Sequence, residues 1–156
     1  MQPEFKTVPL FEGLTMTSAG TVFDAVDTKG FDFLAIDLVA GTGAAASTAV
    51  TTLQLCEADT DPTAYTDGTP ITQFVGAAAV STSAGFVLPA LSSSKQNVYR
   101  FNIDLRGRKR YIGLNFAPEK QTVGVSATAL LFKPEVAPAM ATAATSADGA
   151  RLVVSG

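Results

Sequence analysis

Histidine and tryptophan are absent from the 156 residues, and cysteine occurs once, at Cys56. Without histidine the chain lacks the commonest general base, the usual serine and cysteine triads, and the zinc sites that use imidazole. Cys56 lies in the apolar run TTLQLCEAD, which favours a small buried side chain over a reactive thiol. No Walker loop, GxGxxG, GxSxG or cysteine-pair motif is present. These absences indicate that the protein is not an enzyme, and they imply no cofactor.

Charge is also scarce, since only 16% of the residues are charged and the formal net charge is -3. Proteins that bind nucleic acid usually carry a strongly basic face, so we do not expect nucleic acid as a partner. A sparsely charged surface predicts burial against copies of the chain or against another protein. The first residues, MQPEFKTVPLFEG, lack the pattern of a signal peptide, and no apolar run is long enough to span a membrane. We therefore expect synthesis in a cytoplasm and no membrane association.

Apolar and polar residues alternate along most of the chain. The stretch VYRFNIDLR places its aromatic and aliphatic side chains on one face and its charged ones on the other, the pattern of a half-buried strand. The stretch FDFLAIDLVAG is apolar on both faces and predicts a central strand. Turn-forming clusters separate the apolar runs, and no amphipathic helix stands out. The strands are expected at residues 21–27, 31–41, 49–58, 71–76, 84–90, 98–106, 111–117 and 122–132.

This pattern predicts an all-β fold: a single, jelly-roll-like β-sandwich over residues 15–133, with extended arms at both ends. Residues 1–14 carry two prolines and little alternation, so they are interpreted as an N-terminal arm. Residues 134–156 are rich in alanine and threonine and are interpreted as a C-terminal arm. This arm ends in the strand-forming triplet Leu152, Val153 and Val154, which we expect to pair, either within the chain or on a neighbouring subunit. The alternative is a frayed end.

The basic residues gather in NVYRFNIDLRGRKRYIGLNFAPE, residues 97–119. Two alternating strands flank GRKR, which predicts a hairpin whose turn centres near Gly107 and Arg108. Its tip would carry Arg106, Arg108, Lys109 and Arg110. These residues could form a solvated tip, or they could bind carboxylates of a partner or a neighbouring subunit through bidentate contacts. A nucleic-acid contact is disfavoured, because no aromatic platform or second basic stripe accompanies the tip.

Two groups of carboxylates invite other chemistry. The segment EADTDPTAYTDG offers Glu57, Asp59, Asp61 and Asp67 to calcium, but its spacing does not match an EF-hand loop, so a loop without metal is favoured. Asp32 and Asp37 share a strand, as the paired acids of a glycosidase would. Five positions apart on a strand, they face opposite sides, which disfavours that chemistry.

Residues 98–138, VYRFNIDLRGRKRYIGLNFAPEKQTVGVSATALLFKPEVAP, carry a family resemblance. An arginine-containing turn, a strand that begins Arg110-Tyr111-Ile112, a V-x-V-x-A-x-x-L strand from Val123 and the exit Lys133-Pro134 follow in order. With TLQLCEADT and ITQFVG upstream, this pattern resembles the capsid decoration (cement) proteins and other small virion structural proteins of tailed-phage head modules. The match covers roughly residues 31–135. The alanine- and threonine-rich C-terminal extension is not part of the pattern.

The resemblance implies a decoration protein on the outer surface of a phage head, where it stabilises the shell. The implied partner is the major capsid protein, the implied assembly is a homotrimer, and the implied location is the capsid surface of the virion. The bridging elements would be the two arms, with the basic tip as a second anchor. The partner-binding residues would then be Arg106, Arg108, Lys109, Arg110, Leu152, Val153 and Val154. Alternatives are another virion component (a head fibre base, a head-completion protein or a tail-tube subunit) and a carbohydrate-binding β-sandwich, although sugar-binding faces usually use more aromatic rings.

Overall fold

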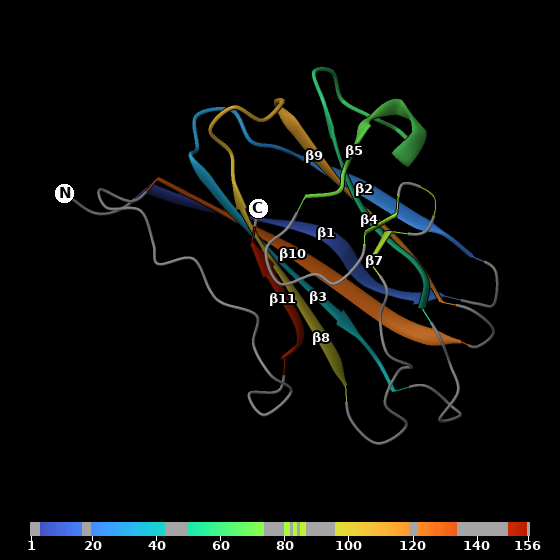
Figure 1. The fold of residues 1–156 in the computed structure, drawn as a ribbon. Helices are drawn as coiled ribbons and strands as arrows, with labels where there is room; N and C mark the ends of the chain where they lie inside the picture. The colour runs from blue at the N-terminus through green and yellow to red at the C-terminus, as the bar shows by residue number, and fades with distance from the viewer. Residues whose placement is uncertain are drawn as a thin grey trace.

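The computed structural model of the chain describes residues 4–16, 20–42, 50–73, 80–81, 83, 85–86, 96–118, 122–133 and 150–155. These residues form two β-sheets that pack face to face (Figure 1). The first, sheet A, has the strand order β1-β10-β3-β8-β11, and the second, sheet B, has the order β2-β9-β4-β7-β6, with β5 beside β4. The strands are β1 (Glu4–Met16), β2 (Val22–Asp27), β3 (Phe33–Ala40), β4 (Val50–Ala58), β5 (Thr69–Ile71), β6 (Val80–Ser81), β7 (Gly85–Phe86), β8 (Asn97–Asp104), β9 (Tyr111–Pro118), β10 (Val123–Lys133) and β11 (Ala150–Ser155).

The chain passes back and forth between the two sheets. Three antiparallel pairs are nested one inside another, because β1 pairs with β10, β2 with β9, and β3 with β8. The first and third of these pairs lie in sheet A and the second lies in sheet B. Such a long antiparallel ribbon, rolled over two sheets, is the arrangement of a jelly roll. The predicted all-β sandwich is confirmed, and β3 lies at the centre of sheet A as expected.

The core lies between the sheets and follows the period-two pattern of the sequence. In β10 the odd-numbered residues from Val123 to Leu131 are buried, while their even-numbered neighbours are exposed or half-buried. The side chains that sheets A and B turn toward each other include Tyr99, Phe101, Ile103, Ile112, Leu114 and Phe116, all no more than 1% exposed. Burial of each large apolar side chain contributes roughly 1.5–3 kcal/mol.

The predicted hairpin of residues 98–106 and 111–117 is wrong. The strands β8 and β9 lie in different sheets, and residues 105–110 cross from one sheet to the other. This connection is anchored on the loop after β2, since the amide of Leu105 donates to the Asp32 carbonyl and that of Thr28 to the Arg110 carbonyl, each at 2.9 Å. Two alternating strands joined by a glycine turn suit a hairpin or an arch equally well, because each strand must bury one face in either case. Gly107 does adopt the expected positive φ, 86°.

The N-terminal segment also differs from the expectation of an arm. Residues 4–14 form most of β1, an edge strand of sheet A, and Leu10 and Phe11 are buried in the core. The pairing of β1 with β10 shifts register between Pro9 and Phe11 and again between Phe11 and Leu14. Each bulge places an extra residue on one strand and so breaks the alternation of faces. The absence of a period-two pattern in this segment is therefore compatible with a long, bulged strand.

Three further strands were expected, at residues 71–76, 84–90 and near the C-terminus. Each is only partly described or differs in its bounds. Of the strand expected at 71–76, only Ile71 lies in a strand, at the end of β5, while residues 72 and 73 lie outside it and residues 74–79 are not described. The strand expected at 84–90 includes β7, with residues 84 and 87–90 outside the described residues. The expected strand at 151–155 is β11, which pairs in parallel with β8 of the same chain. Residues 134–149 of the predicted arm lie outside the described residues. Among the described residues, none of the helical structure has the length and apolar character of a membrane-crossing segment.

Candidate interaction surfaces

The four basic residues of the predicted tip lie near the β8–β9 connection, at one end of the sandwich. Two of them make bidentate ion pairs with carboxylates of the same chain. Arg106 donates from Nε to Asp104 Oδ1 at 2.9 Å and from Nη2 to Oδ2 at 2.6 Å. Arg110 donates in the same way to the two carboxylate oxygens of Asp27, at 2.9 and 2.7 Å. Paired forks of this kind are the strongest geometry for an arginine and a carboxylate.

The other two basic residues are held more loosely. An Nη1 atom of Arg108 lies 3.8 Å from Glu57 Oε2, and Lys109 Nζ lies 3.4 Å from Asp59 Oδ2. Lys109 Nζ also donates to Thr69 Oγ1 at 3.2 Å. The chain itself thus supplies carboxylates to all four basic residues, from the ends of β2, β4 and β8 and from Asp59 just after β4. Binding of a partner's carboxylates by these residues stays a prediction.

These ion pairs lower the pKa values of the carboxyl groups that they contain. The hydrogen bonds from the Arg110 side chain hold the pKa of Asp27 at about 2, against an ordinary value of 3.8. The hydrogen bonds from Arg106 likewise lower the pKa of Asp104. The arginines also cover aromatic rings, since Arg106 Cζ lies 5.2 Å from the centre of the Phe33 ring and Arg110 Cζ lies 5.0 Å from that of Tyr111. The result is a charged end that is neutralised and held in place from within.

The acidic segment after β4 folds around one of its own carboxylates. Asp67, in the short 3-10 helix η1 (Tyr65–Asp67), accepts hydrogen bonds from the backbone amides of Thr63 and Ala64 and from the Thr63 hydroxyl, all at 2.9–3.0 Å. Glu57 and Asp59 face the basic residues described above. Within the described ranges, no group of three or more potential metal-binding side chains comes together. These contacts give the segment a structural role.

The outer face of sheet B is covered by other parts of the chain. Residues 59–68 fold back so that η1 contacts both β4 and β9, and Gly68 packs on Cys56. A Cβ atom at Gly113 of β9 would lie 2.6 Å from the Phe23 ring and 2.9 Å from Cys56 Sγ, so only a glycine fits there. Burial raises the pKa of the Cys56 thiol to about 11. Cys56 is a small buried residue, as predicted from its apolar surroundings.

The outer face of sheet A, by contrast, presents apolar side chains to solvent. Phe5 of β1, Phe132 of β10 and Phe33 of β3 lie in register across three neighbouring strands, and we call them the aromatic row. Their exposure rises toward the free edge of the sheet, from 6% at Phe33 through half-buried Phe132 to 69% at Phe5. The rings of Phe33 and Phe132 stack with centres 5.8 Å apart. Leu130, on the same face of β10, is 39% exposed.

A charged pair lies beside this apolar patch. Arg100 of β8 makes a bidentate contact with Asp37 of β3, with Nε 2.6 Å from Oδ1. Sequence analysis overlooked this face, although one signal was present. In TVGVSATALLF the apolar residues Leu130 and Phe132 fall on positions that face outward in an alternating strand, where polar side chains are the norm.

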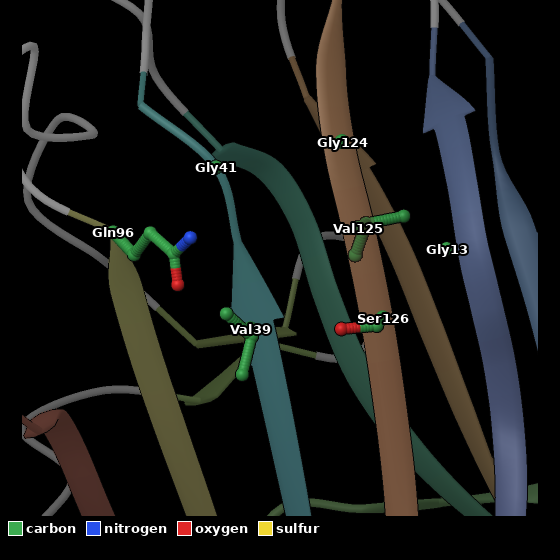
Figure 2. A pocket seen from close by; sticks show the side chains of 7 residues that line it. All are labelled: Gly13, Val39, Gly41, Gln96, Gly124, Val125 and Ser126. Carbon is green, nitrogen blue, oxygen red and sulfur yellow. The ribbon is translucent and has the colours of Figure 1, made fainter.

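Further along the same face lies a shallow groove of about 270 Å³, lined by Gly13, Val39, Gly41, Gln96, Gly124, Val125 and Ser126 (Figure 2). Glycines from β1, β10 and the end of β3 leave the backbone uncovered there. The side chains of Gln96 and Ser126 supply the only polar side-chain groups of this lining. The described residues of this lining carry no ionisable side chain that could act as a general acid or base.

Comparisons with known proteins place the fold. No family model and no curated protein matches the sequence. The fold is similar to that in a crystal structure of the infectious bursal disease virus VP2 subviral particle, with 17% identity over 85% of this chain and a TM-score of 0.51. A structure of the Gx strain of the same virus aligns over 85% of this chain with 17% identity and a TM-score of 0.48. This chain spans about a third of the length of the viral chains, 33% in both cases. The chain therefore shares its fold with part of VP2 of infectious bursal disease virus.

Proposed function

We propose that this chain is a structural protein of a virus particle, a decoration protein that binds the major capsid protein on the outer surface of a phage head and stabilises the shell. The observation that carries the proposal is that the chain covers the outer face of one sheet but not that of the other. Sheet B is covered by its own chain, whereas sheet A leaves the apolar side chains of Phe5 and Leu130 exposed. The fold's likeness to a viral capsid protein supports the same function.

Such a protein would act by adhesion. The apolar patch of sheet A contributes to binding roughly in proportion to the area that a partner removes from water. The Asp37–Arg100 pair beside the patch would fix orientation, because a misplaced partner would leave these charges without hydrogen bonds. Each contact of a small domain is weak, but many copies on a symmetric shell reinforce one another.

The charged end and the C-terminal strand would act as further contacts. Of the four basic residues, Arg108 and Lys109 have the longer ion pairs, 3.8 and 3.4 Å, and Lys109, whose side chain is 39% exposed, is the more accessible of the two to a carboxylate of the capsid protein. Arg106 and Arg110 would keep theirs. The segment Leu152–Val154 lies in β11, whose second edge is not paired among the described residues. The assembly that the resemblance implies is a trimer.

The test uses empty heads assembled from the major capsid protein of the same genome. Purified protein is mixed with the heads, the heads are pelleted through a sucrose cushion, and their melting temperature is measured with and without the protein. We expect the protein to pellet with the heads and to raise their melting temperature. A protein that stays in the supernatant at every concentration, with heads of unchanged melting temperature, would refute the proposal.

A further inference from the structure

The strand β1 forms one edge of sheet A. One side of it pairs with β10, and no strand lies on its other side among the described residues. From Glu4 to Pro9 the pairing with β10 is regular, and register shifts begin only after Pro9. An edge strand of this kind carries unpaired backbone groups that can pair with another strand.

The position of Pro9 indicates which backbone groups point outward. Pro9 lies opposite Thr128 of β10, yet it has no N–H to donate to that strand. Proline is tolerated in an edge strand where its nitrogen faces away from the sheet. Because successive residues of a strand direct their N–H and C=O groups to alternate sides, Phe5 and Thr7 also direct theirs outward. The edge therefore offers donors and acceptors at residues 5 and 7.

The aromatic row ends at this same edge. Arg106 covers Phe33, and Phe33 stacks on Phe132, but Phe5 remains 69% exposed. A large apolar side chain this exposed is unusual, and it lies beside the outward-facing backbone groups of β1. Both features suit a second strand that brings an aromatic side chain opposite Phe5.

We propose that this second strand is β1 of another copy of the chain. The two strands would pair antiparallel about a two-fold axis at Phe5, so that each Phe5 lies opposite its counterpart and the aromatic row continues from one sheet A into the other. The same register sets position 4 of each copy opposite position 6 of the other, and the residues at these positions, Glu4 and Lys6, have opposite charges. The pairing is isologous and gives a closed dimer. It stands independently of the proposed function.

Other registers are less favourable. Centred on Thr7, the pairing would set Phe5 opposite Pro9 instead of opposite its counterpart, so the aromatic row would not continue into the other copy. Centred on Lys6, it would set like charges opposite each other and would match residues whose backbone groups point toward β10. Pro9 and the bulges after it limit the contact to the first residues of β1. So short an interface predicts a reversible dimer that dissociates on dilution.

The test reverses the charges one at a time. In K6E positions 4 and 6 are both acidic, and in E4K both are basic. Each variant alone therefore sets like charges opposite each other in the dimer. An equimolar mixture of the two restores opposite charges at both contacts. Masses are measured by sedimentation equilibrium up to about 0.5 mM protein, a range that detects weak association. Unfolding in urea checks that each variant folds like the wild type, and F5S removes the aromatic contact.

We expect a wild-type dimer, an at least tenfold larger dissociation constant for K6E alone, for E4K alone and for F5S, and recovery of the dimer in the K6E–E4K mixture. A wild-type chain that is monomeric over the whole range would overturn the proposal. A trimer would overturn it in favour of the assembly that the family resemblance implies. Single variants that associate as well as the wild type would also overturn it, because they would show a contact that does not use β1.

Discussion

The two outer faces of the sandwich differ in how far the chain covers them. In β9 of sheet B every residue from Ile112 to Pro118 is buried, so both of its faces are covered. In β10 of sheet A buried and accessible residues alternate from Val123 to Phe132. The cover of sheet B depends on small residues, because Gly68, Gly113 and Cys56 let a loop and a phenylalanine ring approach closely. Sheet A is therefore the side of the sandwich on which Phe5 and Leu130 remain accessible.

The largest expected effect concerns the reactivity of Cys56 beneath this cover. Because burial raises the pKa of the thiol from 9.0 to about 11, its thiolate fraction near neutral pH falls about 100-fold. We expect an aromatic disulfide reagent to modify Cys56 at least about 100-fold more slowly in the native protein than in urea. Modification at the same rate in both conditions would mean that residues 59–68 do not cover sheet B.

A matched pair of glycine substitutions compares the two faces directly. Gly113→Ala adds a methyl group that meets Phe23 and Cys56 at less than 3 Å, and we expect a loss of about 1–3 kcal/mol in the free energy of unfolding. Gly124→Ala adds the same group on the outer face of sheet A, where nothing lies within 4 Å, and we expect a change within about 0.5 kcal/mol. Unfolding in urea measures the free energy of unfolding of both variants. Equal losses of stability in the two variants would contradict the difference between the two outer faces.

Acid should weaken the charged end in a defined pH range. The pKa of Asp27 is lowered to about 2 from 3.8, so its ion pair with Arg110 stabilises the fold above the ordinary pKa and loses this effect as the pH falls toward 2. Both side chains are more than a third exposed, so solvent screening keeps the contribution small. We expect the urea midpoint of the wild type to fall more than that of Arg110→Gln as the pH drops from about 4 to about 2. If the urea midpoints of the two proteins fall equally over this pH range, the Asp27–Arg110 ion pair contributes nothing to stability.

The smallest effect is expected at the open face itself. Leu130 is 39% exposed, so Leu130→Ser should change the free energy of unfolding by no more than about 0.5 kcal/mol. A matched substitution of its buried neighbour, Leu131→Ser, removes a side chain with no exposure and should cost several times more. Urea unfolding of the two variants measures the contrast. A large loss at Leu130 would mean that this side chain serves the fold and is not reserved for a partner.

Much of the fold could be predicted from the alternation of apolar residues, and the exceptions have physical causes. Alternation located β8 and β10 within two residues of their observed ends, because each buries one face against the other sheet. The run that is apolar on both faces located β3 equally well. Neither pattern could distinguish a hairpin from an arch at residues 105–110, since both bury the same faces. Alternation could not predict β1, because the bulges of this strand interrupt the period-two pattern of apolar residues.

The candidate surfaces were harder to predict than the fold. The basic cluster was visible in the sequence, but its internal counter-ions come from β2, β4 and β8, which only the fold brings together. The aromatic row likewise joins residues of β1, β3 and β10 that are far apart along the chain. Only Leu130 and Phe132 gave a local signal, as apolar residues on an outward-facing side.

The most direct test of the adhesive role of sheet A uses one substitution at two places in the co-sedimentation assay with empty heads. Thr128→Asp adds a negative charge to the exposed outer face of sheet A, and Thr66→Asp adds the same charge to exposed η1 over sheet B. A charge buried without a partner weakens an interface strongly, so Thr128→Asp should abolish pelleting with the heads, while Thr66→Asp should bind like the wild type. Equal binding by the two variants, or a loss confined to Thr66→Asp, would contradict the account.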